Sequence, residues 1–227
     1  MRLLTSGLGA AKFIAYQEDF VVPGRKVVPL RDKEMVKERL VSSLGKVLAR
    51  DGYKALDVDA VAREARTSRE RVFRHFRGLE DLVRAYGQTL EFWPTAEELL
   101  GPDQDRKGMS LAAQIGETYK NYLAALRRRP LTLDILAWEG KERTPLTRIL
   151  EGVRVRRSLE VFERIQGEFP DDIDMSAVVA LMAAAVISIA VKSRTCGSFG
   201  GIDLESDAGW SRLEEAIDAL LTRAIVT

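Results

Sequence analysis

The sequence predicts an all-α protein, and three observations support this class. Apolar residues recur at intervals of three and four along most of the chain, the spacing of one helix face. No segment shows a convincing alternation of apolar and polar residues, and there is no internal repeat or low-complexity tract. With 227 residues, of which 46% are hydrophobic and 30% charged, the chain has an ordinary globular composition. This length accommodates one large domain or two small ones.

Residues 1–31 are predicted to form a flexible N-terminal arm. Five glycines and prolines interrupt this segment, and it shows little periodicity. Arg25, Lys26 and Arg31 could contact a phosphate backbone. An extension without a role is the alternative.

Residues 32–78 are predicted to hold three helices. The first begins near Asp32 and ends before Gly52, a residue suited to a helix C-terminus. Asp57 is the predicted N-cap of the second helix, and Ser68 that of the third. The inward stripes of the first two helices are Val36, Leu40, Leu44, Val47 and Leu48, and then Val58, Val61, Ala62 and Ala65.

The third helix, 68–76, carries more positive charge than its stability would favour. Val72, Phe73 and Phe76 share one face and are expected to pack inward. The polar face and the preceding turn present a cluster of cations, whose mutual repulsion is unfavourable. A polyanion is the expected partner, and a solvated charged face is the alternative. The cationic side chains are Arg66, Arg69, Arg71, Arg74 and His75.

Charge is distributed unevenly along the chain. The formal net charge is +1, but residues 24–90 contain 16 basic and 10 acidic residues, whereas residues 91–227 contain 17 and 22. A basic N-terminal region on an acidic body indicates that only the first part meets a polyanion. Random surface variation is the alternative.

Residues 79–227 are predicted to form a larger helical domain. A fourth helix starts near Leu79, has a stripe that includes Leu90, and ends or kinks at Trp93-Pro94. A polar loop from Gly101 to Gly108 is the predicted boundary within the chain. The later segments are helices at Leu111–Arg128, Leu131–Trp138, Pro145–Gly167, Ile173–Lys192 and Trp210–Val226, with a loop at Thr195–Asp207.

The region from Gly52-Tyr53-Lys54-Ala55, through Ala65-Arg66-Thr67-Ser68 and Phe73-Arg74-His75-Phe76, to Leu79-Glu80-Asp81-Leu82 resembles the DNA-binding region of the TetR family of transcriptional regulators. The resemblance covers about residues 33–86 without insertions or deletions. It implies a helix-turn-helix whose third helix enters a DNA groove, a homodimer, and a variable helical domain for a small-molecule effector. DNA contacts are expected from Ser68, Arg66, Arg69, Arg71, Phe73, Arg74 and His75.

The chain departs from the family pattern at four positions. Arg66 replaces a turn glycine, which costs roughly 1 kcal/mol or more if that position needs positive φ. Phe73 replaces a tyrosine whose hydroxyl would reach a phosphate, and Leu79 replaces a lysine. Asp57 replaces a threonine and can still cap a helix.

Aromatic residues of the second domain are candidates for an effector site, because small-ligand pockets are usually apolar and aromatic. Core packing is the alternative for each of them. The candidates are Trp93, Tyr119, Tyr122, Trp138 and Phe162, with Phe92 in the same group. Asp134, Glu139 and Glu142 could meet a cationic ligand or form a solvated face.

The segment Met175–Val191 is apolar almost all round, and it falls short of the roughly 20 residues that span a bilayer. We therefore expect a helix with one face against its own domain and the other against a second subunit. Burial within one subunit is the alternative. The resemblance places the dimer interface at 173–192 and 210–226.

Other classes lack their motifs. There is no phosphate-binding glycine loop, nucleophile elbow or metal-ligand cluster, so we predict neither an enzyme nor a cofactor. The single cysteine, Cys196, and the absence of a secretory pattern predict a cytoplasmic protein. Two hypotheses follow. The first is a DNA-binding transcriptional regulator, specifically a repressor that a small-molecule effector releases from its operator. The second is a helical adaptor whose basic patch binds another acidic macromolecule.

Overall fold

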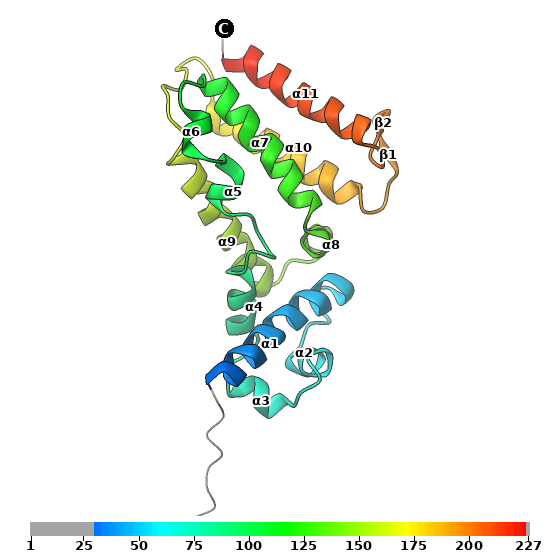
Figure 1. The fold of residues 1–227 in the computed structure, drawn as a ribbon. Coiled ribbons are helices and arrows are strands. Elements are labelled where there is room, and N and C mark those ends of the chain that lie inside the picture. Colours follow the sequence, from blue (N-terminus) through cyan, green and yellow to red (C-terminus); the bar gives the residue numbers. More distant parts are fainter. Residues whose placement is uncertain (1–29, 226–227) are drawn as a thin grey trace, which may run out of the picture.

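The computed structural model describes residues 30–225, with side chains from residue 33 onward, and confirms the all-α class (Figure 1). Residues 1–29 of the predicted arm, with Arg25 and Lys26, lie outside this range, whereas the helix that begins at Leu30 already includes Arg31, so the arm is shorter than the predicted 1–31. The elements are α1 (Leu30–Asp51), α2 (Val58–Glu64), α3 (Arg69–Phe73), α4 (Leu79–Gly87), α5 (Ala96–Leu100), α6 (Asp103–Arg106), α7 (Leu111–Arg127), α8 (Pro130–Glu139), α9 (Pro145–Phe162), α10 (Met175–Lys192), β1 (Ser198–Phe199), β2 (Ile202–Asp203) and α11 (Asp207–Ile225).

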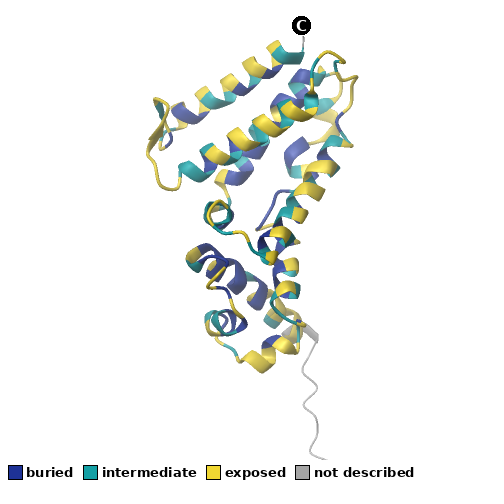
Figure 2. Cartoon of the chain, turned by 180° about the vertical axis from the view of Figure 1, so that it is seen from behind, coloured by how far each residue is buried: buried dark blue, intermediate teal, exposed yellow. Residues whose placement is uncertain are grey.

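Helices α1, α2 and α3 form a small unit at one end of the molecule, and α5 to α11 form a larger one at the other (Figure 1). Helix α4 joins the two because it packs against α1 on one side and α9 on the other. Buried apolar residues form one continuous cluster from α1 to α11, shown in dark blue in Figure 2. The limits of the two predicted domains stay a prediction.

Most predicted inward faces are buried. Leu40, Leu44, Val47 and Leu48 of α1 are fully covered, and they share one core with Val61 of α2 and Val72 of α3. The fourth helix is shorter than expected, since α4 ends at Gly87. Leu90 therefore lies beyond the helix and is 64% exposed, which corrects its place in the predicted stripe.

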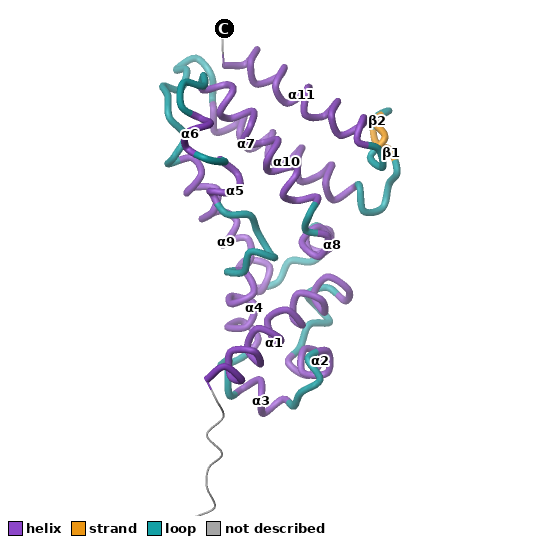
Figure 3. Tube along the Cα trace, in the orientation of Figure 1, coloured by secondary structure: helices purple, strands orange, loops and turns teal. Residues whose placement is uncertain are grey.

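Four elements were missed by the periodicity, namely α5, α6, β1 and β2. Helix α6 is four residues long and lies within the predicted polar loop from Gly101 to Gly108. Helix α5 is only five residues long, and it begins where the Thr95 hydroxyl accepts a hydrogen bond from the Glu98 amide. Strands β1 and β2 form a small hairpin inside the predicted loop at 195–207 (Figure 3). Gly200 and Gly201 make its turn with φ of 60° and 77°, a conformation that favours glycine. Helix α9 also ends at Phe162 instead of Gly167.

Candidate nucleic-acid interface and internal cavity

The turn between α2 and α3 is built by backbone hydrogen bonds. The Thr67 amide donates to the Ala62 carbonyl, and the Arg66 amide donates to the Arg63 carbonyl. This pair of bonds is a Schellman motif, which needs a left-handed residue after the helix. Arg66 occupies that position with φ of 51°. The suspected need for positive φ at Arg66 is therefore confirmed.

Side chains cap both helices of the motif as predicted. Asp57 Oδ1 accepts a hydrogen bond from the Ala60 amide at 2.6 Å, and Ser68 Oγ accepts one from the Arg71 amide at 3.3 Å. These caps satisfy backbone donors at the helix starts. They fix the direction in which α3 leaves the turn.

Helix α3 presents an exposed cationic surface. Arg66, Arg71, Arg74 and the neighbouring Arg77 are all exposed, and within residues 33–225 none of them forms an ion pair. Arg69 differs, because its guanidinium lies 2.6 Å from Asp59 and 5.3 Å from the centre of the Phe73 ring. Four unpaired guanidinium groups around one short helix can receive phosphate or base acceptors.

Phe73 does not pack inward, contrary to the sequence prediction. Its side chain is 45% exposed, whereas Val72 and Phe76 are buried. Val72 and Phe76 are four residues apart and fill the inward face of the helical turn. Phe73 lies beside them and forms an exposed apolar platform under Arg69 on the cationic surface.

His75 is half-buried at the edge of this surface. Burial lowers its pKa below the ordinary 6.5, and the positive charge of Arg71 lowers it further. Glu34 opposes this shift, while Lys33 and Lys37 add to it. The imidazole is therefore biased toward its neutral form in the free protein.

A cavity of about 430 Å³ lies among α7, α9 and α10. Four of the five aromatic candidates line it, namely Trp93, Tyr119, Tyr122 and Phe162. Val155 and Leu159 of α9 also line it and are more than half exposed, so apolar side chains surround its opening. Its volume and apolar lining suit a small molecule.

Trp138 does not line the cavity, which corrects the fifth candidate. Its indole Nε1 donates to the Ala49 carbonyl at 3.0 Å, at the end of α1. Gly52 lies so close that an added Cβ would come within 2.9 Å of the Trp138 ring. Trp138 therefore packs between the two units of the protein. The sequence alone does not distinguish an aromatic residue at such a contact from one that lines a pocket.

The three acidic candidates already form ion pairs or hydrogen bonds with other residues of this chain. Asp134 pairs with Arg194 at 3.1 Å. Glu142 Oε2 accepts hydrogen bonds from the backbone amides of Tyr53 and Lys54 at 2.8 and 3.0 Å. Each carboxylate already has a partner, so the structure gives no support to a cationic ligand.

Glu139 connects the cavity to the helix-turn-helix unit. Its Oε1 accepts from the Tyr53 hydroxyl at 2.7 Å, and its two oxygens accept from both terminal nitrogens of Arg154 at 2.9 and 2.5 Å. Burial and the Glu139 carboxylate raise the pKa of Tyr53 well above its ordinary value, so Tyr53 remains a donor. Arg154 lines the cavity. This role of Tyr53 and Arg154 has no signal in the sequence, because the two residues lie 86 and 15 positions from Glu139 along the chain.

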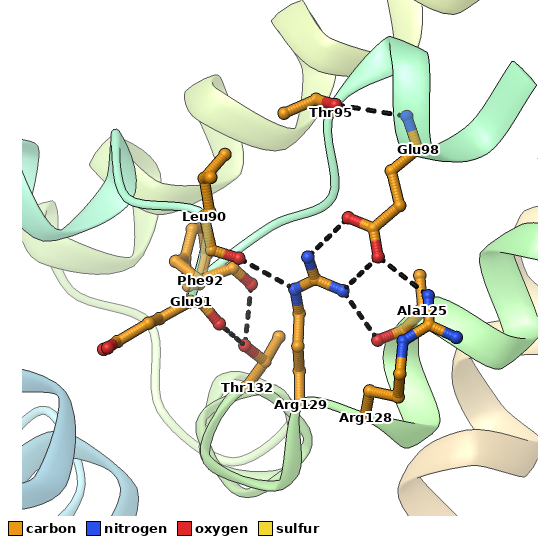
Figure 4. Close-up of polar contacts among 9 residues, drawn as sticks. All are labelled: Leu90, Glu91, Phe92, Thr95, Glu98, Ala125, Arg128, Arg129 and Thr132. Carbon is orange, nitrogen blue, oxygen red and sulfur yellow. Dashed lines mark hydrogen bonds and ion pairs between the residues drawn. The ribbon is translucent and has the colours of Figure 1, made fainter. Parts of the chain in front are cut away.

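The loop that carries Trp93 is fixed by Arg129 (Figure 4). Arg129 Nε donates to the Leu90 carbonyl at 3.0 Å, and its terminal nitrogens donate to both oxygens of Glu98 at 2.9 and 2.5 Å. The buried Thr132 hydroxyl donates to the Phe92 carbonyl at 2.7 Å. These bonds hold one wall of the cavity in place.

Comparison with known proteins agrees with this geometry. Residues 45–86 match the sequence model of the bacterial regulatory proteins of the tetR family. This match is to the TetR family. It spans the end of α1, all of α2 and α3, and α4 except its last residue. Over most of its length the chain has the fold of TetR-family regulators.

Solved structures support the fold over most of the chain. A TetR-family transcription regulator from Marinobacter aquaeolei VT8 superposes with a TM-score of 0.59 at 16% identity, covering 86% of this chain and 98% of its own. FadR from Bacillus subtilis, in complex with stearoyl-CoA, gives 0.60 at 13% identity with coverage of 83% and 98%. NalD, the secondary repressor of the MexAB-OprM multidrug efflux pump in Pseudomonas aeruginosa, gives 0.58 at 15% with coverage of 86% and 97%. Curated protein sequences include no match to the chain.

Proposed function

We propose that this TetR-family protein is a homodimeric repressor that binds duplex DNA through α3 and leaves its operator when a small molecule enters the cavity. The observation that carries the proposal is the exposed, unpaired arginine cluster on a helix-turn-helix that matches the family. Ligand-responsive repression draws support from two similar folds, one solved with stearoyl-CoA and one described as a repressor. Both proteins are at most 15% identical to this chain, so the support comes from the shared fold alone.

The proposed DNA contacts divide by position. Helix α3 is shorter than the predicted 68–76, so Arg71 lies on the helix and Arg74 is its C-cap residue. Both are candidates for base edges or phosphate, because a guanidinium can bind either. Ser68 and Arg69 lie at the start of α3, where backbone donors and positive charge favour phosphate. The full proposed set is Arg66, Ser68, Arg69, Arg71, Phe73, Arg74 and His75.

The proposed dimer interface rests on an uncovered face of α10. By length and composition this helix could cross a membrane, but one side of it packs against α7 and α8. Only Val186 and Ala190 are buried. The side chains on its exposed side are mostly small and apolar, apart from two serines. Leu181 on the same side is 72% exposed. Together with the apolar exposed residues Ala216, Ala219 and Leu220 of α11, this face suits a second copy of the chain.

A mobility-shift assay and a footprint with the DNA that flanks the gene test the proposal. A two-fold dimer should protect two half-sites about one helical turn apart or slightly more. Arg74→Ala should weaken specific binding by about 1–3 kcal/mol if Arg74 contacts a base, or weaken all sequences evenly if it contacts phosphate. Arg148→Ala, an exposed arginine on α9, is the matched control.

Protection of a single half-site, or wild-type affinity for the Arg74 variant at physiological salt, would contradict the proposal. A protein that fails to bind duplex DNA but captures another acidic macromolecule would instead fit the adaptor hypothesis.

A further inference from the structure

Arg154 is the one cationic residue among those that line the cavity within the described part of the chain. Its side chain is 15% exposed, and its guanidinium carbon lies 5.6 Å from the centre of the Trp93 ring. The rest of the lining is mostly apolar, from α5, α7, α9 and α10. Glu151 is the one carboxylate of the lining, and it is paired with Arg143 at 3.2 Å. Arg154 in an otherwise mostly apolar chamber therefore suits a ligand with an apolar body and one negative group.

Tyr122 supplies a second polar group at this wall. The residue is 8% exposed, its ring lies 5.6 Å from that of Trp93, and its hydroxyl makes no hydrogen bond within residues 33–225. By contrast, the Tyr119 hydroxyl donates to the Val179 carbonyl at 2.9 Å. The free hydroxyl of Tyr122 can donate to an oxygen of a ligand in the cavity.

The charge on Arg154 is currently balanced by Glu139, which does not line the cavity. The Glu139 side chain is 9% exposed, and the same carboxylate accepts the hydrogen bond of Tyr53. Tyr53 lies in the connector between α1 and α2, in the DNA-binding unit. One carboxylate therefore neutralises the cavity cation and also holds the two units together.

We propose that the cavity binds an amphipathic monocarboxylate whose carboxylate replaces Glu139 on Arg154, and that this exchange releases Tyr53 and lowers DNA affinity. The proposal rests on the proposed function and adds the ligand class and the switch. Arg154 binds ligand, whereas Glu139 and Tyr53 are positioning residues. When Glu139 loses its cation in this buried position it must rotate toward water, because an unpaired buried carboxylate is unstable. The hydrogen bond to Tyr53 is lost in that rotation.

Decanoate is a direct probe, with decanol and decylamine as matched neutral and cationic compounds. Calorimetric titration of the full-length protein should show decanoate binding roughly tenfold tighter than either control. Glu139→Gln should increase decanoate affinity by roughly tenfold, because the competing charge is gone, and should leave decanol affinity unchanged. General damage to the cavity would weaken binding, so the direction of the change is diagnostic.

Arg154→Met alone would leave Glu139 buried and unpaired, so the second variant is Arg154→Met with Glu139→Gln. It should keep the fold by circular dichroism and bind decanoate no better than decanol. Glu151→Gln is the charge control, because Glu151 also lines the cavity but pairs with Arg143 at 3.2 Å. An equal gain from Glu151→Gln, no gain from Glu139→Gln, or a retained preference for decanoate in the double variant would overturn the exchange.

DNA binding provides the second arm. Saturating decanoate should reduce the DNA affinity of the wild type roughly tenfold, and Tyr53→Phe should shrink this reduction. Wild-type protein that binds DNA regardless of decanoate would overturn the inference and leave the proposed DNA binding standing. Failure to bind DNA at all would overturn the proposed function and the switch, while the titrations would still decide the ligand class.

Discussion

Arg66 adopts the left-handed conformation in the turn before α3, with φ of 51°. A side chain with a Cβ is strained there by about 1–2 kcal/mol, whereas glycine is not. We expect Arg66→Gly to be more stable than Arg66→Ala by roughly 1 kcal/mol in urea unfolding. Both variants lose the same charge, so the difference between their unfolding stabilities reports the cost of the left-handed backbone conformation. Equal midpoints would show that the turn does not impose this conformation in solution.

His75 should make DNA binding dependent on pH. Its pKa in the free protein is below the ordinary 6.5, through burial and Arg71. A nearby DNA phosphate would raise it, so the complex takes up a proton that the free protein lacks. Affinity should therefore rise as pH falls from about 8 toward about 6, around the ordinary histidine pKa, and His75→Gln should flatten the profile. An unchanged slope in the variant would place His75 away from phosphate.

Residue positions were predictable where one helix face determined them. Val72 and Phe76 lie where a period of 3.6 residues puts them. Phe73 and Trp138 were misplaced, because an aromatic side chain satisfies a core, an exposed platform or an interdomain contact equally well. Glu139 was singled out for its charge, but its partners Tyr53 and Arg154 follow only from the tertiary packing.

Arg129 joins the segment between α4 and α5 to Glu98 of α5. Arg129→Met would remove the bidentate partner of Glu98, which is 26% exposed, and leave it only the hydrogen bond from Arg128 at 2.9 Å (Figure 4). We expect a loss of about 2–4 kcal/mol at neutral pH, somewhat below the cost for fully buried pairs. Arg129→Lys keeps the charge and should cost less, because the fork is lost but the cation remains.

The effect of Arg129→Met should also depend on pH. Arg129 lowers the pKa of Glu98 below the ordinary 4.5. The stabilisation is therefore present above about 4.5 and is lost as pH falls through the lowered pKa. Urea midpoints of the wild type and Arg129→Met should converge toward a pH of about 3. A constant gap across this range would mean that packing of the side chain, and not its charge, stabilises the loop.

Most long elements were predicted well and the shortest ones poorly, although the long helix α9 ends five residues before its predicted limit. Helices α7, α8, α10 and α11 begin and end within three residues of their predicted limits. Helix α5 and the hairpin of β1 and β2 are too short to display a period. The Gly200-Gly201 pair was the available signal for the hairpin, since two glycines permit its turn.

At the scale of the whole molecule, the uncovered face of α10 should govern assembly. Ala184 is exposed on this face, while the adjacent Ala183 lines the cavity. Ala184→Glu should leave the subunit folded, because the carboxylate reaches water in the monomer. In a dimer it would be buried twice, at a cost of several kcal/mol. Sedimentation should show monomers for Ala184→Glu and dimers for the control Arg148→Glu. Dimers of unchanged stability in both variants would remove α10 from the interface.

The cavity itself was only partly predictable. Four of its aromatic residues were identified from composition, but the choice of α7, α9 and α10 as its walls depends on how amphipathic helices pack, which one sequence does not specify. The helix-turn-helix was predictable because its spacing is local. Long-range organisation requires contacts between residues that are distant in sequence.

The carboxylate of Glu142 also makes the contact between the DNA-binding unit and the larger helical unit directly observable. It accepts hydrogen bonds from the backbone amides of Tyr53 and Lys54, although both residues lie outside any helix. Surface connectors usually exchange their amide protons rapidly with solvent deuterium. These two amides should instead exchange slowly while the units are joined. They act as natural isotopic reporters, so that one peptide in a mass-spectrometric exchange experiment records separation of the units without any label attached to the protein.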